Sequence, residues 1–216
     1  MKVEVVPVGS RLVDSYPFSI GGTKTQAEAL KRTAVDGLIG YLGHMTPQRL
    51  AYVLDAGLGF VPVTKAGEYE DGPQDEVGQL QALGLPKGTH VFLDLEGLKA
   101  FHTDPLILKA KINAWGDGIM KAEFLPCLYV GAPQPLTGPE LYSLKVYRYW
   151  LGIGRCRDRL NDDAYPDCGW CIRQDWHGNP EPGRPGGMYW RDSGVFVDTN
   201  SVQRDHRGRL PSWVVR

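Results

Sequence analysis

The 216-residue sequence has almost no net charge, few cysteines and no long apolar run. A net charge of −1 at pH 7 gives no bulk attraction to nucleic acid or to an anionic membrane, so we expect neither as a partner. No stretch is long and apolar enough to span a bilayer. The opening MKVEVVPVGSRLVDS lacks the apolar segment of a signal peptide, so we expect a protein made in the cytoplasm without one.

The four cysteines do not predict a metal site. Cys168 and Cys171 form a CxxC motif, but no second pair and no paired histidines lie near it. A redox pair is the other interpretation of this motif, and with Cys127 and Cys156 we expect thiols or at most one bridge. A chain of this length can bury a full core without a metal or a disulfide. We therefore expect no metal at the CxxC motif.

Short apolar runs alternate with segments of helical spacing. Eight runs have the composition of strands: 11–14, 37–42, 58–64, 90–96, 123–131, 146–154, 168–176 and 194–200. Helices are expected at 23–35, 46–57, 70–83, 104–122 and 137–145. This alternation predicts an α/β protein with a parallel sheet and outer helices, and eight units predict a single (β/α)8 TIM-type barrel domain over residues 1–216.

An open doubly wound sheet is the rival fold. It is disfavoured as a dinucleotide-binding fold because the glycine-rich phosphate-binding fingerprint is missing after the first strand. Residues 155–167 and 177–193 are polar and rich in proline and glycine. They predict irregular late helices and long C-terminal loops, which in a compact barrel are often functional.

Carboxylates follow several of the predicted strands. Asp94 and Glu96 end the fourth strand and, two residues apart, point to the same side. Asp14 ends the first strand, Asp175 the seventh and Asp198 the eighth. In a barrel such residues converge at the C-terminal mouth, where active sites lie, although each alone could be a helix cap or a turn residue.

Grouped carboxylates can perform acid–base chemistry, because neighbouring acids let one stay protonated while another stays ionised. Glycoside hydrolysis needs this arrangement. The same acids could instead hold Mg²⁺ or Ca²⁺ for phosphoryl or aldol chemistry. Tyr129, Trp150, Trp176 and Trp190 lie at or beyond strand ends, where flat rings can stack on a sugar, and this favours the glycan. Core packing is the alternative role for each ring.

The order of these features resembles a known family. An aspartate follows the first strand, Asp-Leu-Glu the fourth and Asp-Thr-Asn the eighth, with a glutamine in the seventh. This resembles the family-25 glycoside hydrolases, the Chalaropsis-type lysozymes, and more closely the related glycoside hydrolase-like barrel domain of unknown function from bacteria and phages. The resemblance covers about residues 10–203 and is most specific in AGLGFVPVT, LGLPKGTHVFLDLEG and GVFVDTN. VDSYPFS lacks the family's usual glutamine, and RQDW replaces its Gln-Tyr pair.

The resemblance implies a peptidoglycan-type substrate and no cofactor. It makes Glu96 the proton donor and Asp94 the carboxylate that assists at the anomeric carbon or orients the N-acetyl group, with Asp14 and Asp198 as flanking acids. The expected substrate-binding residues are Tyr129, Trp150, Gln174, Asp175 and Trp176. The leading hypothesis is a muramidase-type endolysin or virion-associated lysin acting on the bacterial cell wall. The alternative is a non-catalytic, glycan-binding or structural barrel in a phage particle, with virion proteins as partners, or in a surface assembly.

Overall fold

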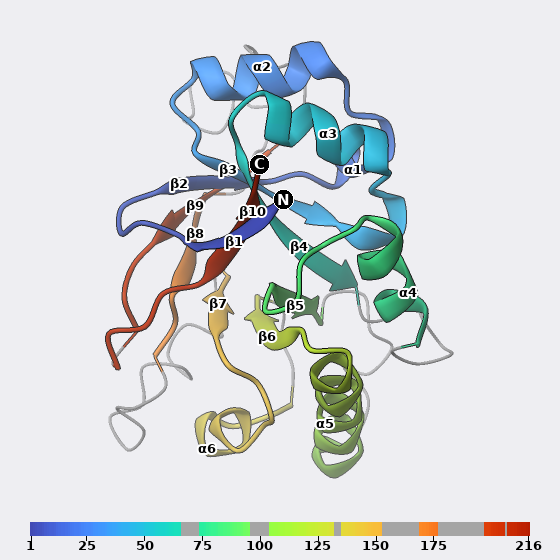
Figure 1. Ribbon diagram of the computed structural model, residues 1–216. Helices are drawn as coiled ribbons and strands as arrows, with labels where there is room; N and C mark the ends of the chain where they lie inside the picture. Colours follow the sequence, from blue (N-terminus) through green and yellow to red (C-terminus); the bar gives the residue numbers. More distant parts are fainter. Residues whose placement is uncertain (66–73, 96–103, 132–134, 153–168, 177–196, 206) are drawn as a thin grey trace.

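The computed structural model describes residues 1–65, 74–95, 104–131, 135–152, 169–176, 197–205 and 207–216. Eight strands close into a barrel because β4 pairs with β5 as well as with β3 (Figure 1). They are β2 (Arg11–Asp14), β3 (Gly37–Tyr41), β4 (Gly59–Lys65), β5 (His90–Asp94), β6 (Leu125–Val130), β7 (Tyr149–Leu151), β8 (Ile172–Trp176) and β9 (Asp198–Val202). The predicted TIM-type (β/α)8 barrel is confirmed.

The direction of the last barrel strand corrects the expected all-parallel sheet. Strand β9 runs antiparallel to both of its neighbours, β2 and β8, whereas the other barrel pairs are parallel. In the β2–β9 ladder, Asp14 pairs with Asp198 and Leu12 with Asn200. Asp198 therefore begins its strand instead of ending it. Because the strand is reversed, Asp198 still lies at the end of the barrel where β2 finishes.

The helices pack on the outside of the barrel (Figure 1). They are α1 (Tyr16–Gly21), α2 (Lys24–Arg32), the short 3-10 helix η1 (Leu42–His44), α3 (Pro47–Asp55), α4 (Gln74–Ala82), α5 (Pro105–Lys121) and α6 (Gly138–Tyr142). Thr23 and Thr46 cap α2 and α3, each accepting a hydrogen bond from a backbone N–H of the first turn. Helix α1 was not predicted. The two late segments expected to be irregular, 155–167 and 177–193, lie outside the described residues.

The core has two layers, separated by the barrel wall. Leu12, Ile39, Phe92 and Trp150 belong to the inner cluster, and their strand neighbours belong to the layer between strands and helices. Successive side chains of a strand point to opposite faces, so the position of one inward residue fixes which others face inward. The same alternation tells which candidate site residues point into the barrel and which point outward.

The two ends of the chain form a strand pair that the sequence did not predict. Strands β1 (Lys2–Val5) and β10 (Ser212–Val215) pair antiparallel, and β10 joins β4 through Val214 and Phe60. Both strands extend the sheet beyond the closed barrel, and Figure 1 shows the two termini close together.

Trp213 of β10 packs into the inner cluster at the N-terminal end of the barrel. A Cβ added at Gly59 would lie 2.2 Å from the Trp213 ring, and one at Gly37 would lie 3.0 Å from it. Both glycines begin strands. Because they have no side chain, the indole can lie directly on their backbone. Nearby, His90 of β5 contacts Ser212 of β10. The chain ends thus cover the side of the barrel opposite the predicted mouth.

Candidate active site

Inward-facing polar side chains gather where the parallel strands end. Asp14, Tyr41, Lys65 and Asp94 are the last residues of β2, β3, β4 and β5, and Tyr129 is the last but one of β6. Each lies two positions after an inner-cluster residue of its strand, so its side chain also points into the barrel. This places one side chain from each of five neighbouring strands around the C-terminal mouth.

Asp14 is oriented by an amide side chain. Asn200 Nδ2 donates to Asp14 Oδ2 at 2.8 Å, and Asn200 Oδ1 accepts from Trp150 Nε1 at 2.9 Å. Because the indole can only donate, the amide must present its N–H group to the carboxylate. Asp14, Asn200 and Trp150 are all buried, at 7%, 1% and 1% exposure. The aromatic ring therefore fixes the amide, and the amide fixes the acid.

Asp198 is held by a second chain of the same kind. Gln174 Nε2 donates to Asp198 Oδ2 at 3.0 Å, and the Tyr129 hydroxyl donates to Gln174 Oε1 at 3.0 Å. Gln174 and Tyr129 are buried, whereas Asp198 is half-buried. Two flanking acids on adjacent strands are thus each positioned through an amide by an aromatic side chain.

Asp94 is 1% exposed, and Tyr41 Oη donates to its Oδ2 at 3.3 Å. In the ladders, Asp94 pairs with Lys65 of β4 on one side and with Tyr129 of β6 on the other. Glu96, the predicted proton donor, lies outside the described residues. Its separation from Asp94, expected to be roughly 5–9 Å for a glycosidase acid pair, stays a prediction.

A cationic and aromatic flank adjoins Asp94. The Lys65 ammonium lies 5.3 Å from the centroid of the Tyr16 ring, and the Tyr16 hydroxyl is hydrogen-bonded to His44 Nε2 at 2.8 Å. The Tyr16 ring also meets the Tyr41 ring edge to face, with centroids 5.1 Å apart. Around the mouth, Tyr41 of β3 and Lys65 of β4 therefore lie between Asp14 of β2 and Asp94 of β5, with Tyr16 packed against both.

Two of the four aromatic residues expected to stack on a sugar, Tyr129 and Trp150, lie deeper than predicted. Trp150 is 1% exposed and packs between Phe92 and Tyr129, with ring centroids at 6.2 and 4.2 Å. The expectation of an open ring face is corrected for Trp150, since its two faces are covered by the core. Tyr129 and Trp150 reach the acids through the amide side chains instead. The side chain of Trp176 and all of Trp190 lie outside the described part.

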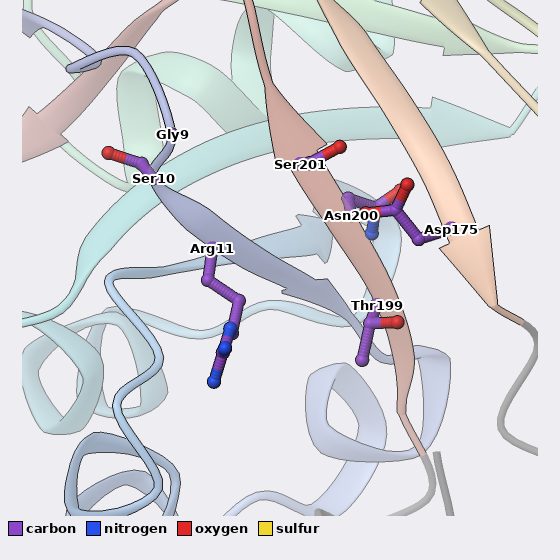
Figure 2. Close-up of a pocket in the computed structure, with 7 residues that line it drawn as sticks. All are labelled: Gly9, Ser10, Arg11, Asp175, Thr199, Asn200 and Ser201. Atoms are coloured by element: carbon purple, nitrogen blue, oxygen red, sulfur yellow. The ribbon is translucent and has the colours of Figure 1, made fainter. Parts of the chain in front are cut away.

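Asp175 lies apart from the other predicted site residues. It alternates with the inward Gln174, is exposed on the outer face of β8, and its Oδ1 is 3.7 Å from Arg173 Nε. It borders a surface hollow of about 350 Å³ between the start of β2 and strands β8 and β9 (Figure 2). The hollow is lined by Gly9, Ser10, Arg11, Asp175, Thr199, Asn200 and Ser201. None of the three mouth carboxylates lines it.

The inner cluster also contains two thiols, Cys127 and Cys171, both free and fully buried. Burial raises the pKa of the Cys171 thiol to about 12 and the pKa of Cys127 well above its usual value. Cys156 and Cys168, and with them the CxxC motif, fall outside the described residues. Within the described ranges, no three His, Cys, Asp or Glu side chains are grouped to hold a metal, and no helix has the length and apolarity to cross a bilayer.

The sequence interpretation missed Tyr41, Lys65 and Asn200 as site residues. A signal was available for the first two, because Tyr41 lies next to the end of the predicted strand 37–42 and Lys65 directly follows the predicted strand 58–64. For Asn200 the signal was weaker, since it depends on the reversed direction of β9, which local patterns do not encode.

Comparisons with known proteins support the fold. No family model matches the chain, and no curated protein sequence matches it. Similar solved structures include an uncharacterized B. stearothermophilus protein, with 17% identity, a TM-score of 0.63 and coverage of 91% of this chain and 97% of that one. A bacterial lysozyme from Streptomyces coelicolor has 10% identity, a TM-score of 0.57 and coverage of 93% and 94%.

A sugar phosphate isomerase/epimerase from Parabacteroides distasonis also shares the architecture, with 13% identity, a TM-score of 0.53 and coverage of 94% and 90%. At such identities the likeness shows a shared barrel fold and no more. The chain thus shares its barrel fold, distantly, with a bacterial lysozyme and with a sugar phosphate isomerase/epimerase.

Proposed function

We propose that this protein is a glycoside hydrolase that cleaves the glycan strands of peptidoglycan, a β-1,4-N-acetylmuramidase that retains the anomeric configuration. The observation that supports it is the convergence of Asp14, Asp94 and Asp198 from three strands on one end of the barrel, each with a hydrogen-bond donor that orients it. Hydrolysis of a glycosidic bond requires a proton donor and a second carboxylate held on opposite sides of the reacting bond.

In this proposal Glu96 protonates the leaving oxygen and Asp94 acts at the anomeric carbon or orients the N-acetyl group. The role of Glu96 rests on its sequence position, two residues after the inward Asp94. The Tyr41 hydroxyl holds Asp94 in one orientation, while the Asn200 and Gln174 amides do the same for the flanking acids. Fixed donors need no rearrangement during the reaction, which is how a preorganised site lowers the barrier.

We propose the bacterial cell wall as the place of action and a phage lysin, free or carried on a virion, as the biological role. The resemblance of DLEG and VDTN to the lysozyme motifs supports this part. The non-catalytic alternative is a barrel that binds the same glycan without cleaving it, and the test below separates the two.

The test is clearing of purified peptidoglycan combined with identification of the released reducing ends. We expect Glu96→Gln and Asp94→Asn each to lower the rate by about 10²- to 10⁴-fold, as loss of an acid–base group does. Asp117→Asn is the matched control, because Asp117 lies on α5 in an exposed ion pair with Lys145. Wild-type protein that binds the wall but releases no reducing ends would establish the non-catalytic alternative.

A further inference from the structure

The cation at the mouth has a position that the proposed hydrolysis does not explain. Lys65 is half-buried at the end of β4. It lies two residues after the inner-cluster residue Val63, so its side chain points to the same side and faces the mouth beside Asp94. Among the residues that the structure describes, no carboxylate lies within 4.0 Å of its ammonium group. Lys65 therefore does not neutralise Asp94 through a direct ion pair.

The ammonium group is instead held over the face of Tyr16. The Tyr16 hydroxyl is fixed by His44, and the His44 carbonyl accepts from Arg49 Nη1 at 2.8 Å. The same Arg49 nitrogen donates to the Ser19 carbonyl at 3.0 Å, which ties η1 to α1. A ring stabilises a nearby cation without cancelling its charge. The charge thus has a defined place at the mouth and is not cancelled by a carboxylate of the described residues.

We propose that Lys65 binds a free carboxylate on the glycan and makes this site selective for acidic sugar chains. In peptidoglycan this is a muramic acid whose lactyl carboxylate carries no peptide. The inference rests on the proposed function for its substrate class. Three carboxylates at the mouth disfavour a bound anion, so an anion there needs direct contact with the Lys65 ammonium group. Neighbouring strands are about 4.8 Å apart, so a carboxylate on Lys65 belongs to a sugar adjoining the bond that Asp94 faces.

The experiment compares three matched oligosaccharides: a muramic acid-containing chain with free carboxylates, the same chain with those carboxylates converted to methylamides, and a neutral N-acetylglucosamine chain. We expect the wild type to have a higher kcat/KM for the free acid than for the amide. Lys65→Met keeps the length of the side chain and should lower kcat/KM for the free acid by about 10- to 100-fold, the range for a charge-assisted hydrogen bond. It should lower kcat/KM much less for the amide and for the neutral chain, and Lys65→Arg should restore most of the preference.

The matched control is Lys87→Met, which removes the same charge from an exposed ion pair with Glu123. Binding of the three chains to Glu96→Gln protein, with and without Lys65→Met, is measured by calorimetry so that recognition is observed apart from cleavage. Binding that favours the free acid and depends on Lys65, without cleavage by the wild type, would retain this inference and remove the proposed hydrolase. Cleavage of free acid and amide at equal rates by the wild type would retain the hydrolase and overturn this inference, whether or not Lys65→Met folds.

Discussion

Protonation of His90 should make the fold sensitive to acid. The side chain is 5% exposed, and its Nδ1 accepts from the backbone N–H of Ser212 at 2.8 Å. Its Nε2 is buried without a hydrogen-bond partner in the described part of the chain. A proton on Nδ1 would face the Ser212 N–H, and burial, with a smaller effect of the Arg148 charge, lowers the His90 pKa from 6.5 to about 3.

The pH dependence of folding stability follows from the difference between the folded and unfolded pKa values of His90. A lowered pKa in the folded state means that the neutral ring contributes stability above the unfolded pKa of 6.5, and that this stability is lost as pH falls toward about 3. Between these values each pH unit costs about 1.4 kcal/mol. The loss between about pH 7.5 and pH 5 is therefore about 2 kcal/mol. Because pH 5 lies well above the folded pKa of His90, this loss of stability depends mainly on the unfolded pKa.

The assay is urea unfolding of wild type and His90→Asn at about pH 7.5, 6 and 5, in which Asn Oδ1 replaces Nδ1 as acceptor. Other titrating groups cancel in the difference between the two proteins. We expect the stability advantage of the wild type to shrink by about 2 kcal/mol over this range. Ser212→Ala is the control and should keep the dependence, because the backbone N–H remains. A difference that stays constant with pH would refute the reasoning.

Three further perturbations test other parts of the structure. Glu76 is buried and accepts a hydrogen bond from Trp115 Nε1, and burial raises its pKa. Its contribution to the free energy of unfolding should therefore decline as pH rises from 4.5. Glu76→Gln should abolish that decline in urea titrations, while Glu76→Ala should lower the free energy of unfolding by about 3 kcal/mol. Gly59→Ala should cost about 1–3 kcal/mol in thermal unfolding, because its Cβ meets the Trp213 ring; unchanged stability would contradict this packing. Cys171, with its raised pKa, should resist iodoacetamide in peptide mapping until the protein unfolds, and rapid labelling of the folded protein would contradict its burial.

Local sequence patterns determined the early units of the barrel. Thr23 and Thr46 cap the first predicted helices, and Gly57 follows the end of α3 with a positive φ of 75°. These signals act within a few residues, so they can be recognised without knowing the fold. The same holds for Asp14 and Asp94. Once a strand and its apolar side are identified, the alternation of side chains fixes which residues face inward.

Only the tertiary structure decided the direction of β9 and the contacts that depend on it. Strand polarity follows from which neighbours a segment pairs with, and the alternation of side chains is the same in either direction. Reversal of β9 brings Asn200 to Asp14 and Trp150, residues far apart in the sequence. Likewise the sequence presents Lys65 only as the residue that follows the apolar run 58–64. Its place beside Asp94 exists because β4 and β5 pair in one register, and that register is set by packing across the whole barrel.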